Sequence, residues 1–247
     1  ASGNGIAELN VTLQAYQDIF CRMIASSDYR ARLIENPATV FEQHDLSDRE
    51  RRRLTAMADH PGMRVNTAIH RANRLTPLDQ TLPFTCFLLG QRLGPLLDRY
   101  WHGNPTENLQ LPAECVRFAD FLAAEMEAGR LLDPIVGEVL AFERACTELR
   151  FYTEQELRLQ AGAAGRLPPQ VRVLRFQHDP ERLLNALSEL QPPPPDLAEG
   201  EFHLAIDARS AEPVFRLLDR RSAAALLGRQ ARAGWCAGSG SPGTKDS

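Results

Sequence analysis

Apolar side chains recur at helical spacing through most of the first 152 residues. Leu13, Tyr16 and Phe20, for example, lie three or four positions apart, as they would on one face of an amphipathic helix. The breaks in this pattern coincide with prolines, glycines and capping residues, which mark where one helix ends and the next begins. The pattern predicts an all-helical N-terminal domain over residues 9–152, preceded by a short disordered start.

Capping signals and prolines set the expected helix boundaries within this domain. Ser47 and Glu50 have the S-x-x-E spacing of a capping box. Pro37 suits the first turn of a helix, and Pro83 interrupts the most apolar segment, where we expect a kink or a boundary. The helices expected after the first are Asp28–Glu35, a short one beginning at Pro37, Ser47–Met57, Met63–Leu75, Leu82–Tyr100, Pro112–Met126 and Pro134–Phe151.

The character of the sequence changes after Tyr152. The stretch up to residue 169 contains alanines, glycines and prolines, which is typical of a linker. Phe202, Leu204 and Ile206 alternate with polar or small residues, as in a half-buried strand. The other elements expected here are a strand over Val171–Phe176, a helix beginning at Asp179 and Pro180, a hairpin strand over Pro213–Leu218 and a helix over Ser222–Arg229.

The fold class that follows is α+β. The helical domain at 9–152 is joined by the linker at 153–169 to a small β-α-β-β-α domain at 170–233. Residues 234–247 are rich in glycine and serine, show no periodicity and are expected to form a disordered tail.

Composition and charge change this picture little. Apolar residues make up 43% of the chain and charged residues 24%, as in ordinary globular proteins. The net charge is −4, whereas nucleic-acid-binding domains are usually basic, so the basic run at 49–53 is interpreted as a solvated helix face. We find neither a signal peptide nor a stretch of about 20 apolar residues, and we expect a cytoplasmic protein without a membrane segment.

None of the common catalytic or metal-binding motifs occurs in the sequence. Its 6 histidines form no i, i+4 pair, and its 5 cysteines form no C-x-x-C pair. Cys86 and Cys146 lie on apolar helical faces, so packing explains them better than nucleophilic catalysis does. Glu138 and Glu143 fall near the start of an expected helix, where the helix dipole favours acids. We therefore expect no catalytic residue, no metal site and no cofactor in this chain.

Two features suit binding rather than catalysis. Tyr100, Trp101 and His102 form an aromatic cluster at an expected helix end. Tyrosine and tryptophan are enriched at interfaces, although packing against the second domain is the alternative interpretation. The small sheet must have edges, and an unpaired strand edge can accept an extended peptide.

The sequence also resembles a known family. The segment I-H-R-A-N-R-L-T-P-L-D-Q-T-L-P-F-T-C-F-L-L-G, followed by L-L-D-R-Y-W-H-G-N-P, F-A-D-F-L and L-A-F-E-R-A-C, is similar to partner proteins encoded beside multinuclear iron-dependent oxidative enzymes. Members of this family were once labelled DNA-binding proteins. The positions that carry the resemblance are Arg71, Asn73, Leu78, Leu82, Pro83, Leu89, Gly90, Tyr100, Pro105, Phe118, Phe121, Leu122, Glu143 and Ala145.

The resemblance implies a non-catalytic accessory subunit. Such a subunit binds a ribosomally made precursor peptide and presents it, within a heterodimer, to an iron-dependent oxidative enzyme that holds the iron. The implied chemistry is modification of a cysteine, such as excision of the β-methylene in 3-thiaglutamate biosynthesis. The β-α-β-β-α order departs from the strands-first winged-helix module usual in these pathways. The residues expected to contact peptide or partner are Arg71, Asn73, Tyr100, Trp101 and, on the strand Glu201–Asp207, Glu201, His203, Ala205 and Asp207.

Two other classes of function stay open at this point. A DNA-binding regulator fits a helical domain with a basic run, although the net charge of −4 argues against nucleic acid as a partner. A stand-alone enzyme, such as a hydrolase, would need a cysteine and a histidine brought together by folding.

Overall fold

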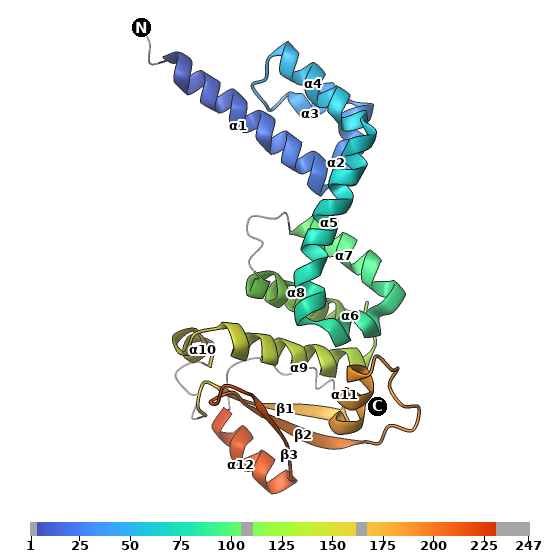
Figure 1. Cartoon of the computed structure of the whole chain (residues 1–247), viewed down its shortest axis with the longest axis vertical. Helices are drawn as coiled ribbons and strands as arrows, with labels where there is room; N and C mark the ends of the chain where they lie inside the picture. The colour runs from blue at the N-terminus through green and yellow to red at the C-terminus, as the bar shows by residue number, and fades with distance from the viewer. Residues whose placement is uncertain (1–3, 105–110, 162–166, 231–247) are drawn as a thin grey trace, which may run out of the picture. The chain divides into compact units, whose positions relative to one another are not determined.

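The computed structural model describes residues 4–104, 111–161 and 167–230 (Figure 1). It confirms the α+β class, because helices dominate the chain and a three-stranded sheet lies near its C-terminal end. The chain divides into two compact units, one formed by Ala1–Thr76 with Trp101–Thr106 and the other by Pro77–Tyr100 with Glu107–Ser247.

Helices account for most elements of the described residues. The helices are α1 (Asn4–Ala25), α2 (Ser27–Glu35), α3 (Pro37–Phe41), α4 (Asp48–Asp59), α5 (Pro61–Thr81), α6 (Pro83–Leu89), the short 3-10 helix η1 (Gly90–Arg92), α7 (Leu93–Gly103), α8 (Leu111–Glu127), α9 (Pro134–Phe151), α10 (Glu154–Ala161), α11 (Pro180–Ser188) and α12 (Arg220–Gln230). The strands are β1 (Val171–His178), β2 (Glu199–Asp207) and β3 (Val214–Leu218).

Several boundaries differ from the sequence-based expectation. Helix α1 already begins at Asn4, within the expected disordered start. Helix α5 continues through Pro77, beyond the expected end at Leu75, since one proline removes only one backbone hydrogen bond from a long helix. The expected helix Leu82–Tyr100 is divided at Gly90, whose φ of 49° lies in the left-handed region that favours glycine. Helix α10 occupies part of the expected linker, and the expected tail at 234–247 lies outside the described residues.

The first unit has its own apolar core. Its helices begin at predicted signals: Ser47 and Glu50 form the expected capping box, with the Ser47 N–H donating to Glu50 at 2.8 Å. Arginines of the basic run face solvent on α4, apart from Arg51, which is half-buried and donates to the carbonyl of Leu46 at 3.0 Å. The buried core residues are Ile19, Met23, Leu33, Phe41, Leu46, Leu54, Ala58 and Met63.

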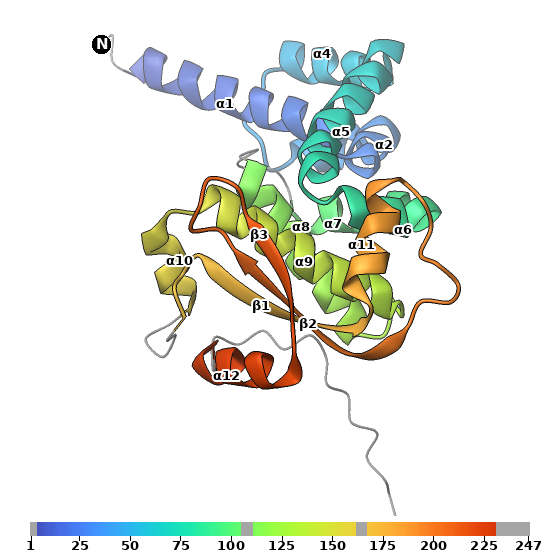
Figure 2. The same cartoon turned by 60° about the horizontal axis from the view of Figure 1, so that its bottom comes forward.

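The second unit is built around the antiparallel sheet, whose strands lie in the order β1-β2-β3. Helices α9 and α11 cover one face of this sheet, and α12 lies on the other face (Figure 2). Val139 of α9 packs with Phe176 of β1 and Leu204 of β2 in one buried cluster. Because α9 contributes to the same core as the sheet, the division between units does not fall at residue 152, where the sequence placed a domain boundary.

Among the residues that the structure describes, no helix is both long enough and apolar enough to cross a membrane.

Candidate functional site

Of the residues expected to contact a partner, Arg71 and Trp101 lie together in the first unit. The guanidinium carbon of Arg71 is 5.2 Å from the centre of the Trp101 ring, and that of Arg74 is 5.3 Å from it. Indole faces attract cations, so both arginines are held against the ring. Arg74, which no sequence pattern marked, is buried and donates to the carbonyl of Asn104 at 3.3 Å. Asn73 is exposed on the same helix.

Tyr100 does not have the position expected of a contact residue. Its side chain is 0% exposed, and its hydroxyl donates to the carbonyl of Glu114 at 3.4 Å. Its ring meets those of Phe118 and Phe121, with centroids 5.1 and 5.5 Å away. Tyr100 is therefore a core residue of the second unit, and its side chain does not reach a partner at the surface.

The strand expected to contact the peptide, Glu201–Asp207, forms most of β2, the central strand. Glu201, His203, Ala205 and Asp207 share its face toward α12, since successive side chains alternate between faces. His203 is buried, Glu201 is exposed, and the other two are half-buried. Because β2 pairs with β1 on one side and β3 on the other, it has no edge open to another strand. An extended peptide could therefore add only at the outer strands of this sheet, β1 or β3.

Strand β3 has an outer edge with no neighbour among the described residues. The N–H of Ala208 donates to the carbonyl of Gln170 at 2.9 Å, so the even-numbered residues of β2 bond toward β1 and the odd-numbered ones toward β3. By the register, Arg216 then bonds toward β2, whereas the N–H and C=O of Phe215 and Leu217 point away from the sheet. These outward groups can accept one more strand.

The side chains of β3 are unusually apolar for an exposed edge. Val214, Phe215 and Leu217 are 49%, 50% and 43% exposed. Edge strands that remain unpaired are usually protected by charges, prolines or bulges. Pro213 lies immediately before the strand and marks it as an edge, a signal in the sequence that could have distinguished β3 from β2.

Glu143 has a structural role that its position near a helix start did not indicate. It is buried on α9, and its carboxylate accepts from the N–H groups of Phe84 and Thr85 at 2.7 and 2.8 Å. These groups open helix α6, whose N-cap residue Leu82 provides no side-chain bond, so Glu143 caps the helix from another element. Burial raises the pKa of Glu143 to about 7, although both hydrogen bonds lower it.

Glu138 connects α9 to the sheet in a similar way. It is buried, and its carboxylate accepts from the N–H of Gln177 at 2.9 Å and contacts Nδ1 of His178 at 3.1 Å. A carboxylate beside an imidazole orients that ring, as in catalytic dyads. Both contacts join α9 to β1, whose side chains share a buried cluster with α9, so the pair helps to hold β1 against this helix.

The described cysteines of the second unit, Cys86, Cys115 and Cys146, all have raised thiol pKa values. Burial, together with a smaller contribution from the charge of Glu143, raises the pKa of the Cys86 and Cys146 thiols to about 12. A thiol of this pKa is almost entirely protonated at neutral pH.

Within the described ranges, no group of three or more histidine, cysteine or acidic side chains is placed to hold a metal ion.

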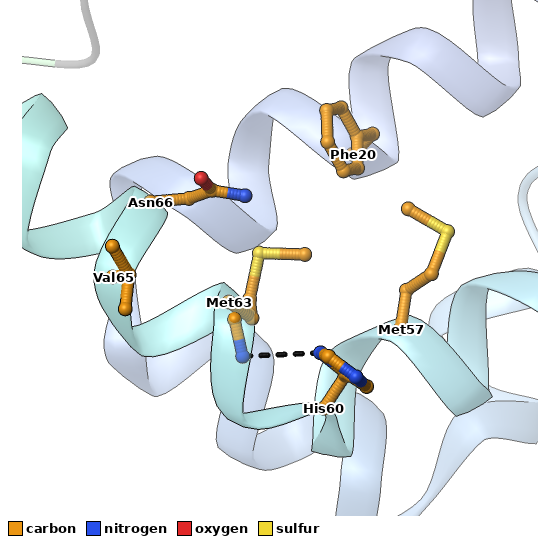
Figure 3. A pocket seen from close by; sticks show the side chains of 7 residues that line it. Phe20, Met57, His60, Met63, Val65 and Asn66 are labelled. Carbon is orange, nitrogen blue, oxygen red and sulfur yellow. Dashed lines mark hydrogen bonds between the residues drawn. The ribbon is translucent and has the colours of Figure 1, made fainter.

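A shallow groove of about 430 Å³ lies in the first unit, between α1 and the start of α5 (Figure 3). His60 at its rim accepts from the N–H of Gly62 through Nδ1 at 3.0 Å. The other side chains are apolar or amide, so the groove offers contact area rather than catalytic groups. Its lining residues are Phe20, Met57, His60, Gly62, Met63, Val65 and Asn66.

Comparison of the sequence with models of protein families and with curated proteins finds no match.

Proposed function

We propose that this chain is a non-catalytic accessory subunit that binds a ribosomally made precursor peptide. The observation that carries the proposal is the outer edge of β3, where the backbone groups of Phe215 and Leu217 point away from the sheet. An extended peptide can add there as a fourth strand, with main-chain hydrogen bonds supplying affinity and side-chain contacts supplying specificity.

The sequence resemblance supports the rest of the proposal. In this account the peptide is presented to a separate iron-dependent oxidative enzyme, which forms a heterodimer with this chain in the cytoplasm. The partner holds the iron and modifies a cysteine of the peptide, for example by excising its β-methylene. The contribution of this chain is to fix the peptide near the reacting centre, since positioning alone can raise an effective concentration by several orders of magnitude.

The experiment that tests the proposal changes one backbone group of the edge. Proline at position 217 removes an N–H that points away from β2, so Leu217→Pro leaves the β2–β3 hydrogen bonds in place. Leu217→Thr is the matched control, because it shortens the same side chain and keeps the N–H. Each variant is co-expressed with a candidate iron enzyme and its precursor peptide, and co-purification, iron content and peptide mass are measured.

We expect both variants to co-purify with the enzyme and its iron. Leu217→Pro should reduce peptide modification at least about tenfold, since one edge hydrogen bond and the fit of the added strand are lost, while Leu217→Thr should stay within about twofold of the unchanged chain. Modification by the proline variant at the unchanged rate would contradict the proposal. So would the failure of the unchanged chain to form a complex with any such enzyme.

A further inference from the structure

We propose that the peptide segment bound at β3 carries an acidic residue opposite Arg216, with an apolar residue on each side of it. This inference rests on the proposed function and gives the chemistry of the peptide that the edge selects.

The two faces of β3 differ in what they offer an added strand. Phe215 and Leu217 pair with Ile206 and Leu204 of β2, so their side chains lie on the apolar face that α9 and α11 cover. The ring of Phe142 on α9 lies 5.7 Å from that of Phe215. Peptide residues opposite Phe215 and Leu217 would point to this same face, where apolar side chains would cover the two half-exposed residues.

Arg216 pairs with Ala205 of β2, so its side chain lies on the opposite face of the sheet, toward α12. Asp207, which pairs with Val214 on that same face, has its carboxylate already bonded to Arg209 at 2.8 Å. Arg209, and more weakly Arg216, hold the pKa of Asp207 at about 2, so this acid stays ionised. An added strand would place one residue directly opposite the exposed Arg216, in a pair without backbone hydrogen bonds, where facing side chains come closest. Opposite charges stabilise such a pair.

A second copy of the chain is a poor occupant of this edge. Two β3 strands can pair antiparallel over their full length in a register centred on position 216. In this register the outward N–H and C=O groups of Phe215 bond to those of Leu217 in the second copy. It places Arg216 directly opposite Arg216 of the second copy, and like charges in this position are destabilising. A shift toward the start of the strand brings Pro213, which has no N–H, into the pairing.

Binding of two matched peptides to the full chain tests the inference. The probe is a fluorescein-labelled peptide of sequence Ser-Thr-Val-Glu-Val-Thr-Ser, and its control has lysine in place of the glutamate. Affinities are measured by anisotropy at low salt for the unchanged chain and for Arg216→Gln, Arg216→Glu and Leu217→Pro. Circular dichroism verifies that each variant is folded.

We expect the unchanged chain to bind the glutamate peptide about tenfold more tightly than the lysine peptide. Arg216→Gln should abolish this preference, Arg216→Glu should reverse it, and Leu217→Pro should weaken both peptides. Equal binding of the two peptides, still lost with Leu217→Pro, would overturn the charge inference and leave the proposed function standing. Binding of neither peptide would also overturn the inference, whereas the turnover experiment above decides the proposed function separately.

The same samples distinguish other occupants of the edge. The unchanged chain should sediment as a monomer at micromolar concentration. A dimer that Leu217→Pro dissociates would assign the edge to a second copy and overturn the inference. Much tighter binding of both peptides after removal of residues 231–247 would assign the edge to the chain's own C-terminal segment and overturn it as well.

Discussion

The ring of Phe142 on α9 lies 5.7 Å from the ring of Phe215 on β3, at an interplanar angle of 50°. This contact brings the long helix of the second unit to the edge of its sheet. An added strand would therefore meet an aromatic side chain from α9 as well as the backbone of β3. The proposed binding site has two parts, which are the outward backbone groups of Phe215 and Leu217 and an apolar flank formed by Phe142.

The apolar flank can be tested at Phe142. Phe142→Ala should lower the affinity for a bound peptide about three- to tenfold, because it removes apolar area next to the added strand. Phe151→Ala is the control, since Phe151 lies at the end of the same helix and its ring stacks with Arg150 rather than with β3. Peptide anisotropy measures both variants, and equal effects of the two would contradict a role for the flank.

The charge at position 216 should keep the chain monomeric. Arg216→Val removes the like-charge pair from the most favourable β3–β3 register and lengthens the apolar edge, so this variant should dimerise at micromolar concentration. Arg220→Val serves as the control, because Arg220 is exposed on α12, outside the strand. Sedimentation velocity measures both. A monomeric Arg216→Val protein would show that something other than this charge protects the edge.

Buried Glu143 should make stability depend on pH. Its pKa is about 7 in the folded chain and lies near 4.5 when the chain is unfolded. A raised folded pKa contributes stability that is complete below the unfolded pKa and is lost as pH rises through the folded one. The free energy of unfolding should therefore rise as pH falls from 8 to 5, with up to about 3 kcal/mol from this group. Urea titrations at several pH values measure it.

Glu143→Gln provides the comparison for this titration. Glutamine does not ionise, and its side-chain oxygen can still accept one of the two N–H groups at the start of α6. The pH dependence between 5 and 8 should be weaker in this variant than in the unchanged chain. Identical slopes in the two proteins would rule out Glu143 as the titrating group.

The link between Glu138 and β1 should stabilise the second unit. Glu138→Ala leaves the N–H of Gln177 and Nδ1 of His178 without their acceptor, which should cost about 1–3 kcal/mol in the free energy of unfolding. Glu127→Ala, at an exposed position on α8, should change stability by less than about 0.5 kcal/mol. Urea denaturation measures both. A loss no larger in Glu138→Ala than in the control would contradict the assigned role.

Local signals predicted much of the fold. The expected helix Pro134–Phe151 is present with the same bounds, because Asp133 caps it and Pro134 suits its first turn. The alternation of Phe202, Leu204 and Ile206 likewise predicted a strand with one apolar face. Each of these signals acts within a few residues, so a single sequence contains all the information needed.

The order of the strands depends on distant pairings and was not predictable in the same way. The hairpin pattern indicated that β2 and β3 are neighbours, but not that β1 takes the other side of β2. For that reason the residues expected at the peptide, Glu201 to Asp207, lie on the central strand, whereas the open edge belongs to Phe215 and Leu217.

Glu143 shows the same limit for a buried polar group. Its hydrogen-bond partner Thr85 lies 58 positions earlier in the chain. From the sequence alone, the favourable helix dipole near a helix start already explained why an acid stands at position 143. Only packing of α6 against α9 shows that it caps a second helix.

Hydrogen exchange at single amides of β3 tests the central claim most directly. In the free chain, the amides of Val214 and Arg216 should be protected by β2, while those of Phe215 and Leu217 exchange freely. Addition of a precursor peptide that the complex modifies should then protect Phe215 and Leu217. If both amides still exchange freely while the peptide is bound and modified, the peptide does not bind at the edge of β3.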